Sequence, residues 1–525
     1  MENRKTKIIS VVAIVALALT VITATYAYFQ AQVGDPAAAD VKINANTVDT
    51  FTFASGSAIS FSINQDNFAS GKGNQTGSTY ASATLTANNK TNTATEHYYL
   101  YLNIESNTFT YSINESTPEI IMTVTDSSDN EVTDISTLNH VIVTGANGDQ
   151  VSGYDITNKN GLITLFNNRE ITTTSSKEER WNIKVTFVNY DKNQSANAGK
   201  SMSAKVMIQK EVIPQVVSDV CTNGENLATC ITTLAGKSSA SITKIYHHDA
   251  KLTNGAGDSS YRYSGANPNN YVCFGSNEST CPTDNLYRII GVFGNQVKLI
   301  KYDYATSALL GTDGDYASTG TPNASYYKGS LTTINTYYWN NSTKKNTWSE
   351  SLLNKTNLNT NFINNIGEEW ANKIATTTWK VGGNTYANIS QVVPSVAYQN
   401  EIVNPVTTNT TDNAKEYSAK IGLMYVSDYG FGADPSAWTT TLYNYDGSVN
   451  GSTIRSLNWM HMGYYDWTIS RNADTSNLAF YVNYDGFVGD YGVDNGNAVR
   501  PSFNLESSIT YVSGSGSASD PMVIN

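Results

Sequence analysis

Short runs of alternating apolar and polar residues follow one another from about Asp40 to Lys210. They are dense in β-branched and aromatic residues, and turn-forming Gly, Asn and Asp separate them. Side chains alternate faces along a strand, so each run predicts a strand with one buried face. Several such strands without a helical period are typical of a β-sandwich. The runs are FTFASGSAISFSI, TYASATLTANN, HYYLYLNI, EIIMTVTD, GLITLFNN, RWNIKVTFVNY and KSMSAKVMIQKEV.

From about residue 245 the pattern mixes strands with a helix. The runs LYRIIGVF and QVKLIKY flank Gly294-Asn295, which predicts a hairpin with a two-residue turn. Further on, apolar side chains recur every fourth residue, which is the spacing of one helix face. Gly367 interrupts this stripe and predicts two short helices. AKIGLMYVSDYGF predicts another buried strand. The stripe consists of Leu358, Phe362, Ile366, Trp370 and Ile374.

These patterns predict a mainly β chain with a smaller α+β part. A chain of 525 residues is also too long for one ordinary core. We expect a signal or anchor helix at residues 1–30, a β-sandwich at 31–212, a connector at 213–244 and an α+β domain at 245–525. The connector holds CTNGENLATC, and it is either a linker or the first turn of the second domain.

Composition agrees with strands and turns and excludes one class of partner. Charged residues are only 15% of the chain, whereas tyrosine occurs 34 times among many Asn, Thr and Ser residues. The net charge of −12 argues against nucleic acid, because phosphate binding needs clustered Lys and Arg. Solubility alone would account for this acidity.

The N-terminus predicts export. Lysine and arginine precede a charge-free run from Ile8 to Phe29, which is long enough to span a bilayer as a helix. Cations before an apolar run keep that end in the cytoplasm, so the rest of the chain would lie outside. The run is either a retained membrane anchor or a signal peptide, with small Thr25 and Ala27 preceding a cut at Tyr28. We expect an extracellular location, at the cell surface or anchored in the membrane with the C-terminus outside.

The four cysteines form two close pairs along the chain. In an exported chain, each pair predicts a small disulfide loop, Cys221–Cys230 and Cys273–Cys281. Neither pair has the CxxC spacing of a zinc or redox site. Four cysteines allow three pairings, and free thiols are the alternative.

Two parts of the chain resemble known families. TYAYF, at the end of the apolar run, resembles the signal segment of the TasA/camelysin group of exported Gram-positive matrix proteins. In that group a dedicated signal peptidase cuts within such a segment, and a β-sandwich follows. The second half resembles the C-type-lectin-like fold of the formylglycine-generating-enzyme type. The resemblance is in the order of the hairpin, the helix, KIGLMYVSDYGF, WTISRNA, AFYVNYDGFV, AVRPSFNL and GSGSASDPMVI.

The second resemblance bears on function. Formylglycine formation uses a pair of late cysteines, and this chain has no cysteine after Cys281. The resemblance therefore implies the other use of the fold, which is ligand binding by an exposed surface near the C-terminus.

One polar and aromatic stretch near the C-terminus is the candidate surface. Asp485-Gly486 predicts a two-residue hairpin turn that pairs Tyr484 with Phe487. Alternation then predicts a buried face of Phe480, Val482, Tyr484, Phe487 and Tyr491. The opposite face would carry Ala479, Tyr481, Asn483, Val488 and Asp490. Tyrosine, amide and carboxylate groups suit a sugar or protein ligand. The candidate ligand-binding residues are Tyr481, Asn483, Asp490, Asp494, Asn495 and Asn497.

Two residues beside this stretch are expected to be structural. They are Trp467 and Arg500, and we expect Arg500 to clamp a carboxylate or carbonyl groups near the core. We expect no catalytic residue and no resident metal or cofactor. GTDGDY or the series Asp485, Asp490 and Asp494 could hold calcium, which prefers several oxygen ligands, although neither follows the EF-hand pattern.

The sequence thus predicts an exported bacterial cell-surface protein for binding or adhesion. The sandwich would be its stalk and the lectin-like domain its head. The expected partners are an extracellular glycan or protein, and the membrane if the N-terminal segment is uncleaved. One alternative is a structural matrix or filament protein that associates through strand edges. The other is an enzyme acting on glycan or cell wall, which lacks an acid/base cluster placed by a motif.

Overall fold

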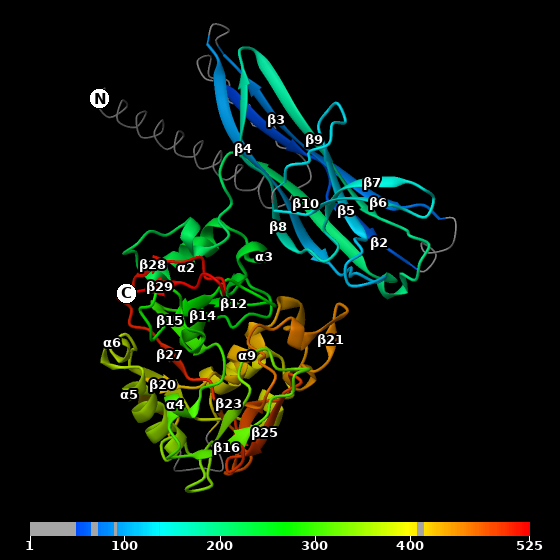
Figure 1. The fold of residues 1–525 in the computed structure, drawn as a ribbon. Coiled ribbons are helices and arrows are strands. Elements are labelled where there is room, and N and C mark those ends of the chain that lie inside the picture. The colour runs from blue at the N-terminus through cyan, green and yellow to red at the C-terminus, as the bar shows by residue number, and fades with distance from the viewer. Residues whose placement is uncertain (1–48, 65–71, 89–91, 136, 407–413) are drawn as a thin grey trace, which may run out of the picture. The chain divides into compact units, whose positions relative to one another are not determined.

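The chain forms two compact units, Met1–Val212 and Ile213–Asn525. The computed structural model describes residues 49–64, 72–88, 92–135, 137–406 and 414–525. The expected signal or anchor segment at residues 1–30 lies outside this part of the chain. Within the described part, none of the helices is both long and apolar enough to cross a membrane. Both units are built on antiparallel sheets (Figure 1), so the described chain is mainly β, as predicted.

Two antiparallel sheets make up the first unit (Figure 1). In spatial order, one consists of β1 (Thr50–Ser55), β3 (Gln75–Thr86), β9 (Ser176–Phe187), β5 (Ile120–Thr125), β7 (Gln150–Asp155) and β6 (His140–Thr144). The other consists of β2 (Ile59–Ser62), β10 (Ser201–Gln209), β4 (Ala94–Asn107) and β8 (Gly161–Thr173). Alternation turns Ile183 and Val185 of β9 inward, where they share one core with Leu100 and Leu102 of β4.

One antiparallel sheet, made of both long and short strands, runs through the second unit. Its spatial order is β11 (Ile245–His247), β12 (Tyr261–Tyr263), β14 (Leu286–Phe293), β15 (Gln296–Lys301), β27 (Ser502–Asn504) and β20 (Ile421–Gly422), with β13 (Tyr271–Cys273) also pairing with β14. The predicted hairpin is confirmed, because Phe293 pairs with Gln296 and Gly294 takes a positive φ of 63° in the turn.

The expected connector at 213–244 is part of the second unit. It forms helices α2 (Leu227–Lys237) and α3 (Ala240–Thr243), and α2 begins where the Asn226 side chain accepts a hydrogen bond from Thr229 N. Leu227, Ile231 and Leu234 are buried in the main core of this unit. The segment cannot be a free linker, because its apolar side chains are needed in that core.

The predicted helical stripe folds as a series of short helices. A π-helix, η5 (Leu353–Phe362), continues into α5 (Ile363–Asn365), and α6 (Glu368–Ala371) follows. The break lies at Gly367, where φ is 83°, a value that favours glycine. The predicted strand AKIGLMYVSDYGF is wrong in its second half. Only Ile421–Gly422 pairs as β20, and Val426–Gly432 is helix α9, whose Asp428 side chain caps its own N-terminus.

Smaller sheets and helices complete the second unit. The sheets are β16 (Tyr316–Gly320), β17 (Ile334–Tyr338) and β26 (Gly496–Asn497); β23 (Asp466–Arg471), β24 (Leu478–Val482) and β25 (Val488–Gly492); and the pairs β18 (Thr377–Lys380) with β19 (Glu416–Ala419), β21 (Ser448–Val449) with β22 (Ser452–Thr453), and β28 (Tyr511–Ser513) with β29 (Val523–Ile524). The remaining helices include α4 (Ser307–Leu310), α7 (Tyr386–Ile389), α8 (Pro394–Tyr398) and the π-helix η6 (Gln399–Val403).

Both predicted disulfides are confirmed. Cys221 bonds to Cys230 with their Cα atoms 5.6 Å apart, and Cys273 bonds to Cys281 with their Cα atoms 5.7 Å apart. Disulfides of this kind are typical of proteins in oxidising compartments outside the cytoplasm.

Candidate functional site

The β24–β25 hairpin has a different register from the predicted one. Val482 pairs with Val488, and Asn483 N donates to Phe487 O at 2.8 Å. The turn therefore spans three residues, 484–486, and Gly486 adopts the φ of 112° that closes it. The prediction of a two-residue turn at Asp485-Gly486 was wrong, because the extra turn residue shifts the second arm by one position.

This shift exchanges the faces of the second arm. Val488 and Asp490 lie on the face of Phe480 and Val482, not on the opposite face as predicted. Phe480, Val482 and Val488 are buried in one apolar cluster. Phe487 and Tyr491, which were assigned to the core, lie on the Tyr481 face, and Tyr491 is 45% exposed.

The candidate ligand residues are therefore only partly on a surface. Tyr481 is half-buried, and Asp494 is exposed and pairs with Lys344 at 3.3 Å. Asn495 is half-buried, and its side chain donates to Gly492 O at 3.2 Å.

Three of the candidates bond to other residues of the fold. Asn483 is only 8% exposed and donates to the Tyr481 hydroxyl at 3.3 Å. Asn497 is 1% exposed, because it pairs with Tyr337 inside a sheet. Asp490 accepts a hydrogen bond from the Asn472 side chain.

The structure adds aromatic side chains that the hairpin pattern did not reveal. Tyr481 lies 5.6 Å from Tyr491, 6.5 Å from Phe487 and 6.0 Å from Tyr465, measured between ring centroids. The contacts continue outward from these rings, so that one connected set forms. We call it the tyrosine face, and it consists of Tyr326, Tyr443, Tyr465, Tyr481, Tyr484, Phe487 and Tyr491.

The tyrosine face is partly open to solvent. Tyr443 is 44% exposed and packs on Phe487 at 5.5 Å, and at the other end Tyr326 packs on Tyr484 at 5.0 Å. The Arg455 guanidinium lies 5.0 Å above the Tyr326 ring. Burial raises the pKa of Tyr481 to about 12, so its hydroxyl keeps its proton at neutral pH. Exposed rings with protonated hydroxyls offer flat apolar area together with hydrogen-bond donors.

Trp467 and Arg500 make structural contacts beneath this face. Arg500 Nε donates to Asp466 Oδ2 at 2.7 Å, and its Nη2 donates to Met460 O at 2.6 Å. Trp467 is fully buried, and its Nε1 donates to Tyr337 O at 2.8 Å. Both side chains hold together segments that are far apart in the sequence.

The carboxylates of GTDGDY, one of the two sets suggested for calcium, accept hydrogen bonds from other parts of the second unit. In GTDGDY, Asp315 accepts hydrogen bonds from Asn341 N and Leu353 N, and Asp313 accepts one from the Asn361 side chain. Among the described residues, the group that brings three metal-ligating atoms together is Cys221, Glu225 and Cys230. Its cysteines form a disulfide, so they offer no thiolate to a metal.

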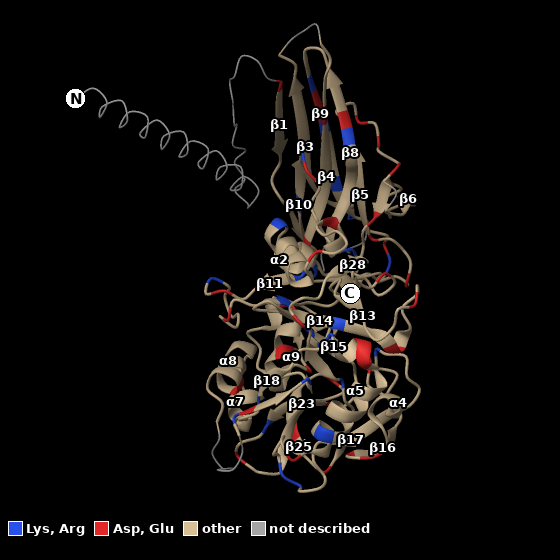
Figure 2. Ribbon diagram, turned by 90° about the vertical axis from the view of Figure 1, so that its left-hand side faces the viewer, with Lys and Arg blue, Asp and Glu red and all other residues tan. Residues whose placement is uncertain are grey.

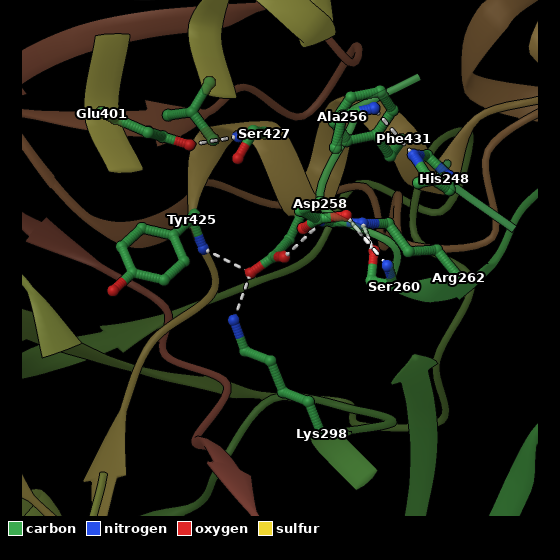
Figure 3. A network of polar contacts seen from close by, with 12 residues as sticks. His248, Ala256, Asp258, Ser260, Arg262, Lys298, Glu401, Tyr425, Ser427 and Phe431 are labelled. Atoms are coloured by element: carbon green, nitrogen blue, oxygen red, sulfur yellow. Dashed lines mark hydrogen bonds and ion pairs between the residues drawn. The ribbon is translucent and has the colours of Figure 1, made fainter. Parts of the chain in front are cut away.

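A buried polar network lies in the core of the second unit (Figure 3). Asp428 Oδ2 accepts hydrogen bonds from Lys298 Nζ at 2.6 Å and from Tyr425 N at 2.9 Å. Its Oδ1 faces Arg262 Nη1 at 3.4 Å. Arg262 Nη2 bonds the Asp258 carboxylate at 2.6 Å. The side chains of Lys298, Asp428 and Arg262 are each at most 6% exposed, so no ligand can reach them without opening the core.

Glu401 belongs to the same network. Its Oε1 accepts Ser427 N at 2.7 Å, and its Oε2 accepts the Ser470 hydroxyl at 2.6 Å. Burial, with a smaller contribution from the charge of Asp428, raises the pKa of Glu401 to about 7. This carboxyl group therefore changes its charge near neutral pH.

The sequence held signals for both sets of residues. Arg262, Lys298 and Asp428 are charged residues inside the otherwise apolar or aromatic runs YRY, QVKLIKY and YVSDYGF, in a chain where charged residues are sparse (Figure 2). A charge at such a position must be paired if the run is buried. Adjacent tyrosines at 326–327 and 464–465 mark two of the segments that supply the tyrosine face, but their meeting depends on the tertiary fold.

Neither the protein-family models nor the curated proteins include one that matches this chain.

Proposed function

We propose that this chain is an exported bacterial cell-surface protein whose second unit binds an extracellular glycan or protein through the tyrosine face. The observation that carries the proposal is the connected set of rings, two of which, Tyr443 and Tyr491, are more than two-fifths exposed. Rigid aromatic side chains give contact area at a low cost in conformational entropy. The first unit, as a β-sandwich, would be the stalk.

Export and fold type belong to the same proposal. The two disulfides and the apolar N-terminal run support a place outside the cytoplasm. Protease added to intact producing cells should digest the chain beyond residue 30, and full protection would contradict this topology.

A C-type-lectin-like fold for the second unit is supported by the antiparallel sheet that joins early strands such as β14 to the late strand β27.

Binding can be tested with the full chain on arrays of glycans and of extracellular proteins. Tyr443→Ala and Tyr491→Ala should each weaken binding at least several-fold, since both rings are exposed. Tyr99→Ala is the matched control, because Tyr99 is a half-buried ring of the first unit that stacks on Tyr101 at 6.4 Å. Equal binding by all three variants would contradict the assignment of the tyrosine face.

A structural matrix or filament protein is the second candidate. The observation that favours it is β6, which lies at the edge of its sheet and exposes 67% of Ile142. Edge strands with exposed apolar residues pair readily with other chains. Sedimentation of the purified protein separates the two proposals. Polymers that disappear in Ile142→Lys would support the filament protein. A monomer would favour the binding protein.

A further inference from the structure

Lys298 and Asp428 form a close contact between an amine and a carboxyl group within the buried polar network. Lys298 is on β15 and Asp428 is on α9, so they are 130 residues apart in the chain. Lys298 Nζ lies 2.6 Å from Asp428 Oδ2, and the exposed fractions of the two side chains are 6% and 2%. The binding surface proposed above does not use this pair.

Aromatic rings enclose the amine. Lys298 Nζ lies 4.6 Å from the centroid of the Tyr425 ring, 5.3 Å from that of Trp379 and 5.6 Å from that of Phe293. Burial in these surroundings lowers the pKa of Lys298 and so favours the neutral, nucleophilic amine. A buried ion pair also carries a desolvation penalty, which a neutral product would not.

We propose that Lys298 and Asp428 condense to an intramolecular isopeptide bond. The neutral amine attacks the carboxyl carbon, the Nζ–Cγ bond forms, and the Cγ–Oδ2 bond breaks. The ammonium and carboxylate together hold three protons, of which one stays on the amide nitrogen and two leave with Oδ2 as water. The step is a condensation and needs no oxidant, reductant or co-substrate.

The neighbours of the pair fit this step. Arg262 Nη1 faces Oδ1, the oxygen that remains as the amide carbonyl and carries negative charge in the tetrahedral intermediate. Arg262 is itself neutralised by Asp258 at 2.6 Å and bonds the Ser260 hydroxyl at 2.8 Å. The loss of the Asp428 charge therefore leaves Arg262 with its closer partner.

Proximity of the amine to the carboxyl group lowers the barrier to the condensation. Well-oriented intramolecular reactions reach effective molarities on the order of 10⁵–10⁸ M, which offsets the competition from water. The core excludes water from the product, since both residues are buried. The bond would covalently join β15 to α9 across the core of the second unit.

Mass spectrometry of the full chain tests the proposal without depending on any variant. The reduced wild-type protein should be lighter than its sequence by one water, and its tryptic digest should contain a branched peptide that joins the Lys298 and Asp428 segments. Full mass with trypsin cleavage after Lys298 would mean an ion pair only and would overturn the proposal.

Two variants remove the remaining ambiguity. Lys298→Arg keeps the charge but cannot form this amide, so it should retain the full mass. A water loss that persists in Lys298→Arg would come from another site and would also overturn the proposal. Asp428→Asn should form the same amide with loss of ammonia instead of water, and should give a branched peptide identical to that of the wild type.

Discussion

The buried carboxyl group of Glu401 makes the stability of the second unit depend on pH. Glu401→Gln is the matched perturbation, because the amide has the same shape. Its oxygen can still accept from Ser427 N, and its NH₂ group can donate to the Ser470 hydroxyl, so that both hydrogen bonds survive. The variant removes only the ability to ionise.

The size of the pH-dependent change in unfolding free energy follows from the pKa of Glu401. Burial raises the pKa from 4.5 to about 7 in the folded protein, which corresponds to about 3 kcal/mol of unfolding free energy. The folded state holds the proton more tightly than the unfolded state. The stabilisation is therefore complete below pH 4.5 and is lost as the pH rises through about 7. Between pH 5 and pH 8 we expect wild type to lose about 2–3 kcal/mol relative to Glu401→Gln.

Urea unfolding at several pH values, followed by tryptophan fluorescence, measures this difference. All tryptophans except Trp181 lie in the second unit, so the signal reports mainly on that unit. Glu416→Gln is the control, because the side chain of Glu416 is 53% exposed. Parallel stability profiles for wild type and Glu401→Gln would refute the reasoning, since they would show that Glu401 has the same proton affinity in both states.

Three further predictions concern the hairpin, a buried ion pair and a disulfide. Phe480→Ala should lower the unfolding free energy by about 3–5 kcal/mol, whereas Tyr491→Ala should change it by no more than about 0.5 kcal/mol; thermal melting with the opposite order would contradict the observed register. Arg500→Met leaves the Asp466 carboxylate buried without its partner, so the unfolding free energy should fall by about 3–5 kcal/mol at neutral pH. The loss should be smaller below about pH 6, because burial raises the pKa of Asp466 to about 6. Replacing the Cys273–Cys281 pair by serines should cost about 2–3 kcal/mol, because the loop that it closes is short; an unchanged melting temperature would argue against this disulfide.

Sequence patterns correctly predicted those features of the fold that neighbouring residues determine. The alternating runs became the strands of the first unit, Gly294-Asn295 became a hairpin turn, and Gly367 divided the helical stripe. The cysteine pairs followed from their closeness in the sequence. In each case the determining residues are neighbours in the chain.

The sequence predictions failed where contacts between distant segments determine the local structure. Val426–Gly432 is apolar enough for a strand, but Asp428 caps a helix there and pairs with Lys298 and Arg262 from distant strands. The hairpin turn took one residue more than Asp485-Gly486 suggested, which moved Asp490 to the core side. The tyrosine face depends on rings from several separate segments, so no single stretch could have predicted it.

The docking of α2 has a consequence for how the second unit can be joined to other proteins. Gly224 N donates to Tyr511 O, Tyr511 N donates to Glu225 O, and Leu227 N donates to Ile509 O, so the first segment of this unit is hydrogen-bonded to one of its last. A unit whose two ends lie side by side can be inserted into a surface loop of another protein without stretching either connection. The same closeness would allow a circular permutant, in which a short linker joins residue 525 to residue 213 and new termini open at an exposed loop.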